Sequence, residues 1–138
     1  MKTKSFFISS LLFTGSLTLI LMSMTLPNQE KPWIVPKKYE KMENPYLDAK
    51  DEDNVGRILY TKHCKSCHGK NGRGDGTKAS SVDTPVPDFA KDAFKKETDG
   101  SLYYKSVFGR DDMPNFEKKI TEEEERWLLI NYMKTLAD

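Results

Sequence analysis

The chain contains only two cysteines and two histidines in 138 residues, and it has no marked excess of charge of either sign. Its formal net charge is +1. A protein that binds nucleic acid needs a basic stripe, so this balance argues against that class. Apolar residues make up 37% of the chain and charged residues 31%. The core must therefore be small, and the stability of a domain of this size is marginal unless a cross-link or a bound group adds to it.

The sequence also lacks the strict alternation of apolar and polar residues that marks a half-buried strand, and it shows no internal repeat. Helical spacing is present instead, and it predicts helices within residues 53–67, 97–109 and 122–136. Gly and Pro residues between them predict loops. The sequence therefore predicts an all-α fold.

The first and last of these helices have recognisable starts. Asp53 is placed to cap the first helix, where Val55, Ile58 and Leu59 recur at helical spacing. Thr121 and Glu124 have the spacing of a capping box at the start of the last helix. The expected apolar faces are Leu102, Tyr103 and Val107 in the middle helix, and Trp127, Leu129, Ile130, Tyr132, Met133 and Leu136 in the last.

Residues 1–26 form a leader with two basic residues at its start and no charge over residues 6–26. Without this leader, 20 basic residues remain against 21 acidic ones. A cleaved signal peptide and an uncleaved membrane anchor both fit the pattern. Either places the rest of the chain outside the cytoplasm, in the periplasm or at the outer face of the membrane.

Residues 27–52 hold four prolines and many charges, which predicts an extended tether between the leader and a domain at residues 53–138. Trp33, Ile34, Val35 and Tyr39 interrupt this polar composition. A solvated spacer has no use for a large apolar side chain such as tryptophan. We therefore favour packing of these residues on the domain or on a partner.

Both cysteines and both histidines fall within residues 63–69, HCKSCHG. The pattern C-x-x-C-H at Cys64, Cys67 and His68 is the attachment signature of haem c. Cysteines three apart on a helical turn point the same way, so each sulfur can form a thioether with one vinyl group. The imidazole of His68 can then reach the iron from the same side.

The same cysteine pair could also form a disulfide, a redox dithiol or part of a zinc site. A disulfide or a redox dithiol shares the C-x-x-C spacing, but the dithiol fold needs a βαβ pattern that is missing here. A structural zinc site needs four ligands on two separated arms, whereas these ligands lie on one short segment.

A haem iron needs a sixth ligand or stays open to small molecules. His63 adjoins Cys64 and cannot reach the opposite face of the same haem, so we interpret it as a surface or packing residue. Met133 belongs to the apolar face of the last helix. Met113 lies in a loop before Pro114 and is the first choice for the distal ligand, which would raise the reduction potential relative to two nitrogen ligands.

Residues 53–138 resemble the class I monohaem cytochromes c. The resemblance rests on Gly56 and Tyr60 before the C-x-x-C-H motif, on the glycine-rich loop after it, on Met113-Pro114, and on WLLINYM in the last helix. The segment WIVPKKYEKMENP is also similar to lead-in segments of some bacterial members, including ones attached to membrane respiratory complexes.

The resemblance implies that the first and last helices cross over a covalently bound haem, with Gly56 allowing the backbone of Tyr132 to approach. In the family, a loop proline carbonyl often accepts a hydrogen bond from the proximal histidine. Thr77 stands where many relatives have that proline, and Pro85 and Pro87 are the substitutes. Candidate pocket walls are Tyr60, Phe89, Tyr103, Phe108 and Phe116.

The expected function is transfer of single electrons, without catalysis of its own. The expected partners are redox proteins, namely a quinol-oxidising complex and a terminal oxidase or reductase. Basic residues near the motif could steer an acidic partner or be plain solvated surface: Lys62, Lys65, Lys70, Arg73 and Lys78. Two alternatives stay open, a fixed subunit of a membrane complex and an open-site haem protein that uses Arg110 as a distal polar group.

Overall fold

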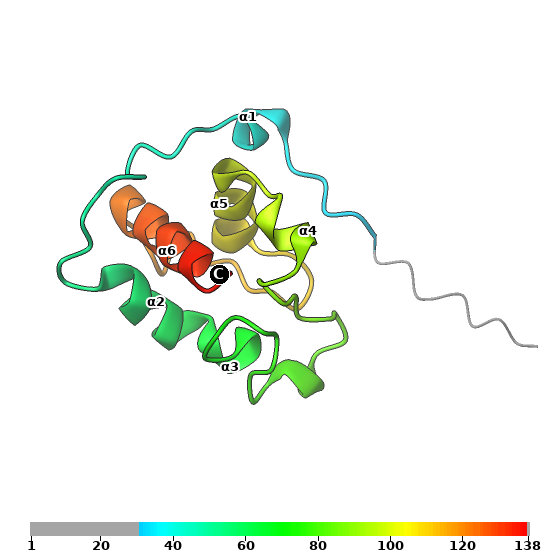
Figure 1. Cartoon of the computed structure of the whole chain (residues 1–138). Coiled ribbons are helices and arrows are strands. Elements are labelled where there is room, and N and C mark those ends of the chain that lie inside the picture. Colours follow the sequence, from blue (N-terminus) through cyan, green and yellow to red (C-terminus); the bar gives the residue numbers. More distant parts are fainter. Residues whose placement is uncertain (1–30, 138) are drawn as a thin grey trace, which may run out of the picture. The chain divides into compact units, whose positions relative to one another are not determined.

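In a computed structural model, Trp33–Asp138 form one compact unit. The structure describes residues 31–137, so the leader expected at residues 1–26 lies outside the described part. The helices of this unit are α1 (Lys37–Glu40), α2 (Val55–His63), α3 (Lys65–His68), η1 (Ala79–Ser81), α4 (Asp92–Lys95), α5 (Asp99–Phe108) and α6 (Glu123–Thr135) (Figure 1).

The prediction of an all-α fold is confirmed. The β pairing found within residues 31–137 is one isolated bridge between Arg110 and Met113. Helices α5 and α6 lie where the sequence placed them, whereas the helix expected over residues 53–67 breaks at Cys64 into α2 and α3. No helix among the described residues is long and apolar enough to cross a membrane.

Helices α2 and α6 lie side by side (Figure 1), and they meet at Gly56. A Cβ atom on Gly56 would lie 2.2 Å from the carbonyl oxygen of Leu128 and 2.9 Å from Cβ of Tyr132. The missing side chain therefore permits the close contact that the resemblance implied. The backbone that approaches is that of Leu128, one turn before Tyr132.

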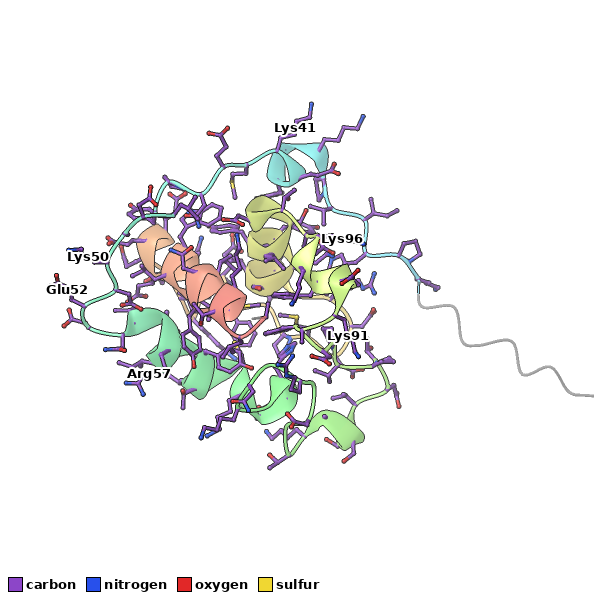
Figure 2. All side chains as sticks on the ribbon, in the orientation of Figure 1. Lys41, Lys50, Glu52, Arg57, Lys91 and Lys96 are labelled. Carbon is purple, nitrogen blue, oxygen red and sulfur yellow. The ribbon has the colours of Figure 1, made fainter. Side chains whose placement is uncertain are left out.

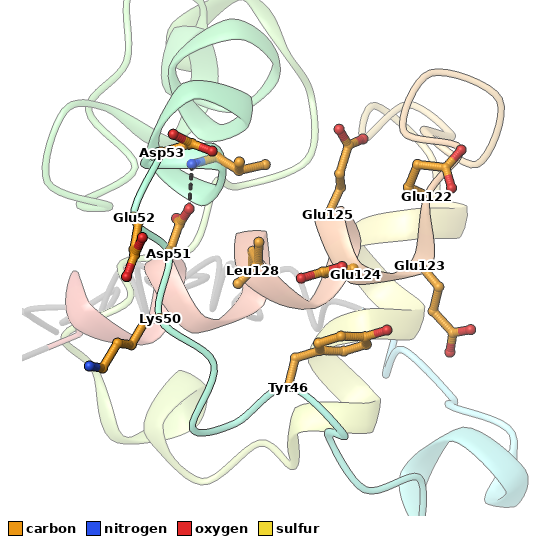
Figure 3. Close-up of a pocket in the computed structure, with 11 residues that line it drawn as sticks. Tyr46, Lys50, Asp51, Glu52, Asp53, Glu122, Glu123, Glu124, Glu125 and Leu128 are labelled. Atoms are coloured by element: carbon orange, nitrogen blue, oxygen red, sulfur yellow. Dashed lines mark hydrogen bonds between the residues drawn. The ribbon is translucent and has the colours of Figure 1, made fainter.

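The start of α2 is capped by a residue other than the expected one. Oδ1 of Asp51 accepts a hydrogen bond from the N–H of Val55 at 2.6 Å (Figure 3). Its Oδ2 accepts one from the N–H of Gly56 at 2.9 Å. Asn54 precedes the helix in the left-handed region, at φ 55°. This turn brings Asp51 under the helix end and leaves Asp53 exposed, so the prediction that Asp53 caps α2 is wrong.

The capping box expected at α6 is also absent. The N-cap is Glu122 and has no side-chain hydrogen bond to the helix, while the hydroxyl of Thr121 lies 3.2 Å from Oε1 of Glu122. The acidic first turn of α6 remains favourable, because carboxylates lie at the positive end of the helix dipole.

We predict that Asp51→Ala lowers the free energy of unfolding by about 1 kcal/mol, because two N–H groups at the start of α2 lose their acceptor. Asp53→Ala is the matched control and should change it by a few tenths of a kcal/mol at most, as expected at an exposed site. Denaturant unfolding of the two variants checks this. Equal losses would show that Asp51 is not the cap.

Residues 33–46, here called the strap, pack on α5 and α6 and include α1 (Figure 1). The ring of Tyr39 lies 4.9 Å from that of Tyr104 and 5.4 Å from that of Phe108. The side-chain amide of Asn131 donates to the carbonyl of Tyr46 at 2.7 Å. Packing of Trp33 and Tyr39 on the domain is thus observed. Ile34, expected in the same group, is 81% exposed.

The core lies between α2, α5, α6 and the loops that join them. All the expected pocket-wall aromatics belong to it or pack against it, and Phe108 is the one that is only partly buried. Trp127 is fully buried, and its ring lies 4.5 Å from that of Tyr103. The largest fully buried side chains in this core are Trp127, Tyr60, Phe89, Ile120 and Ile130.

Candidate functional site

The C-x-x-C-H segment forms one helical turn at the junction of α2 and α3. The N–H groups of Cys67 and His68 donate to the carbonyl of Cys64, at 3.1 and 2.9 Å. This turn carries both sulfurs and the imidazole on five consecutive residues, from Cys64 to His68. The structure thus brings together three of the four site residues that the sequence predicted.

Neither cysteine forms a disulfide. Burial, with a smaller contribution from Cys67, raises the pKa of the Cys64 thiol to about 12. Reactive dithiols have the opposite property, since their thiolates are stabilised and their pKa values are lowered. The environment of Cys64 therefore disfavours a redox dithiol.

His68 is 8% exposed, and its burial lowers the imidazole pKa to about 4. The ring is therefore neutral near pH 7, which is the form that binds a metal. Its buried Nδ1 has no hydrogen-bond partner among residues 31–137. Neither Pro85 nor Pro87 accepts from it, so the structure does not supply the proline carbonyl that the resemblance suggested.

The glycine-rich loop folds back onto the carbonyl end of α3. Gly74 donates to the carbonyl of His68 at 3.0 Å, and Gly76 donates to that of Cys67 at 3.0 Å. The Tyr60 hydroxyl donates to the carbonyl of Gly69 at 2.7 Å. These bonds satisfy groups at the end of the helix that would otherwise be orphaned, and they hold the turn that carries His68 in place.

Phe89 packs directly beside the imidazole. Its ring centroid lies 5.0 Å from that of His68 and 4.1 Å from that of Phe94, against which it stacks. A Cβ atom on Gly72 would lie 2.4 Å from the Phe89 ring, and Gly72 has a φ of +69°. Sequence reasoning found Phe89 but missed Phe94, because a single aromatic in a one-turn helix leaves no periodic signal.

Met113 lies in a tight turn after α5. Arg110 and Met113 exchange backbone hydrogen bonds in both directions, each at 2.9 Å. Asp111 between them has a φ of 51°. The Asp112 carboxylate accepts bonds from the N–H groups of Asp83 and Thr84, which hold its pKa below the usual range. The half-buried Met113 thus sits in a loop with defined anchors.

Met113 and His68 come from separate elements, the loop after α5 and the helix α3. The Met113 loop approaches the motif through Phe116, whose ring lies 5.4 Å from that of His63. His63 is partly buried, and burial together with Lys62 and Lys119 lowers its pKa. This agrees with a packing role for His63.

The described residues disfavour a structural zinc site. No group of three or more His, Cys, Asp or Glu side chains within residues 31–137 is arranged to hold a metal ion. The zinc alternative therefore lacks a ligand set there. Two unpaired thiols and a neutral imidazole without a hydrogen-bond partner fit haem c instead, because haem c needs two sulfurs for its thioether bonds and a nitrogen for its iron.

An open pocket lies elsewhere, between the segment before α2 and the start of α6 (Figure 3). Seven carboxylate side chains line it, from Asp51 to Asp53 and from Glu122 to Glu125, with Lys50 as its one basic residue. This pocket is unsuited to haem, whose propionates are anionic. Other charged side chains, such as Lys41, Arg57, Lys91 and Lys96, extend from the ribbon in Figure 2 and are exposed.

Comparison with known proteins identifies the family. Residues 54–137, more than half of the chain, match the cytochrome c family. The search of curated proteins gave no match. Among solved structures, the Kuenenia stuttgartiensis reducing HAO-like protein complex Kustc0457/Kustc0458 is 27% identical with a TM-score of 0.58, over 70% of this chain and 50% of that one.

The c-type cytochrome KustC0563 is 26% identical with a TM-score of 0.51, over 60% of this chain and 98% of that one. The present chain thus spans about half the length of the first of these structures and nearly all of the second. The fold, the motif at Cys64, Cys67 and His68, and the family match agree, and this chain belongs to the cytochrome c family, whose members carry covalently bound haem c.

Proposed function

We propose that the protein carries single electrons between redox proteins, with one haem c attached through Cys64 and Cys67 and its iron ligated by His68 and Met113. The observation that carries this proposal is the helical turn that presents two unpaired thiols and a buried, neutral imidazole together. When bound, haem supplies a one-electron couple between Fe(II) and Fe(III). No substrate has to enter.

Each residue then has a defined task. The Cys64 and Cys67 sulfurs form thioethers and fix the position of the cofactor. His68 supplies a neutral nitrogen without first having to lose a proton, since burial has already lowered its pKa. Met113 would supply the second protein ligand to the iron, and its thioether would raise the reduction potential relative to a second nitrogen. Buried aromatic rings, among them Phe89, exclude water.

For its partners, we propose acidic docking surfaces on a quinol-oxidising complex and on a terminal oxidase or reductase. The supporting feature is a set of exposed basic residues before, within and after the motif, namely Lys62, Lys65, Lys70, Arg73 and Lys78. Arg73 is already paired with Asp88 at 3.2 Å, so it contributes least to this positive surface. Such surfaces speed association and make the rate salt-dependent.

We further propose that the protein works in the periplasm or at the outer face of the cytoplasmic membrane, because the leader at residues 1–26 is typical of export. A second candidate is a fixed subunit of a larger assembly. It is favoured by the neighbour of 27% identity, which comes from a protein complex. The packing of Trp33 and Tyr39 on their own domain means that these rings are not the docking elements of such a subunit.

The contacts of Arg110 support a carrier over an open-site haem enzyme. Its guanidinium lies over the Trp33 ring, and its Nε is 3.0 Å from a carboxylate oxygen of Asp111. The residue that a distal catalytic site would recruit is thus engaged in structural contacts.

The test uses the matured wild-type holoprotein. We expect a reversible one-electron redox titration, a ferrous form that binds carbon monoxide slowly and weakly, and no turnover of peroxide. Fast carbon monoxide binding together with peroxide turnover would contradict the carrier function and favour the open-site alternative.

A further inference from the structure

We infer that the strap holds the Met113 loop in its ligating position through Trp33, which makes Trp33 a positioning residue for the distal ligand. This inference rests on the proposed ligation of iron by Met113. It assigns a function to a segment that lies before residues 54–137, the part that matches the family.

The first step is the contact between Trp33 and two cations. The guanidinium carbon of Arg110 lies 4.7 Å from the centroid of the Trp33 ring, and Nζ of Lys105 lies 5.9 Å from it. Both are within the range of cation–π attraction, and tryptophan is the best aromatic partner for it. Trp33 therefore links the strap to the last turns of α5 and to the first residue of the Met113 turn.

The second step leads from Arg110 to Met113. The backbones of these two residues are joined by two hydrogen bonds of 2.9 Å, Arg110 N–H to Met113 carbonyl and the reverse. A shift of Arg110 therefore displaces the backbone of Met113 as well. The loop is also held at Phe116, which donates to the carbonyl of Val107 at 2.8 Å, and at Asp112, whose carboxylate accepts from the N–H groups of Thr84 and Asp83. At the Arg110 end, the side chain contacts the Trp33 ring and the Asp111 carboxylate, and Trp33 is the contact that the strap supplies.

The third step is the anchoring of the strap itself. The Tyr39 ring packs on Tyr104 and Phe108, and the Thr98 hydroxyl donates to the carbonyl of Glu40 at 2.9 Å. A Cβ atom on Gly100 would lie 1.9 Å from the carbonyl oxygen of Tyr39, so the strap rests directly on the backbone of α5. These contacts fix the strap to α5 six residues after Trp33, which keeps Trp33 close to the end of α5.

Met113 held in this way is released from the iron in only a small fraction of molecules. An external ligand can bind only to that fraction, so its apparent affinity is reduced by the same factor. Loss of the Trp33 ring removes an attraction that exists only while Arg110 is in place, and so it raises the fraction in which Met113 has left. The spectrum of the resting protein should hardly change, because most molecules still hold Met113 on the iron. The affinity for an external ligand should rise.

The experiment measures imidazole binding to the ferric holoprotein. We expect Trp33→Ala to bind imidazole about fivefold more tightly than wild type, the size expected from one cation–π contact. Trp33→Phe should retain part of the wild-type behaviour. The matched control is Ile34→Ala, the exposed neighbour in the same strap, which should bind imidazole as wild type does. Arg110→Gln combined with Trp33→Ala should add little to either change alone.

The outcomes separate the inference from the proposal on which it rests. If Met113→Ala leaves the ferric spectrum of the wild type unchanged, the proposed ligation fails. If Met113→Ala changes that spectrum but Trp33→Ala binds imidazole like Ile34→Ala, the ligation stands and the role of Trp33 is overturned. A loss of unfolding free energy in Trp33→Ala without tighter imidazole binding overturns it too, because that result describes a merely structural ring.

Discussion

Replacing Met113 with alanine should raise the affinity of the ferrous holoprotein for carbon monoxide by about a hundredfold or more. In the wild type, carbon monoxide can bind only to molecules that have released the methionine. The apparent affinity is therefore reduced by the fraction of molecules in that state, and the substitution removes this reduction. The reduction potential should fall as well, because the thioether ligand raises it.

The controls are the other methionines of the described residues. Met42 is half-buried in the strap, and Met133 is buried in α6 near the Ser106 hydroxyl, 3.7 Å from its sulfur. Met42→Leu and Met133→Leu keep the volume and should leave the carbon monoxide affinity unchanged. Weak carbon monoxide binding in Met113→Ala, with strong binding in either control, would assign the distal position to another residue.

Gly56→Ala should lower the free energy of unfolding of the holoprotein by about 2 kcal/mol or more. Two effects oppose each other. Alanine favours a helix over glycine by about 1 kcal/mol. However, the new Cβ atom would lie 2.2 Å from the Leu128 carbonyl oxygen. Backbone atoms cannot rotate away as a flexible side chain can, so α2 and α6 must separate, and the steric effect wins.

Ile58→Ala on the same helix is the matched control, since Ile58 is 55% exposed. It should change the unfolding free energy by about 0.5 kcal/mol or less. Denaturant titration of both holoproteins gives the comparison. A Gly56→Ala variant that is as stable as wild type would show that α2 and α6 do not meet as closely as the structure has them.

The sequence predicted the chemistry of the site better than its surroundings. The C-x-x-C-H motif is local, so Cys64, Cys67 and His68 could be recognised without any knowledge of the fold. The bounds of α5 and α6 followed from apolar spacing, which reports directly on a buried helix face. The choice of Met113 also came from the sequence, through its position before Pro114, and its ligation remains a prediction.

Features that depend on the folded backbone could not be predicted. The cap of α2 is Asp51 rather than Asp53, because Asn54 adopts a left-handed conformation that spacing rules do not anticipate. The partner of Gly56 depends on the relative placement of two helices distant in sequence. The contact of Trp33 with Arg110 joins residues 77 positions apart, so composition could suggest that Trp33 packs but not on what.

Covalent attachment of haem is tested most directly by a pyridine haemochrome spectrum of protein matured in a host that attaches haem c. Covalent attachment through both Cys64 and Cys67 predicts one haem per chain, the spectrum of a haem with two saturated vinyl groups, and colour that stays with the chain under denaturing conditions. A folded protein that emerges colourless, or that releases its haem to acidified organic solvent, would contradict this account.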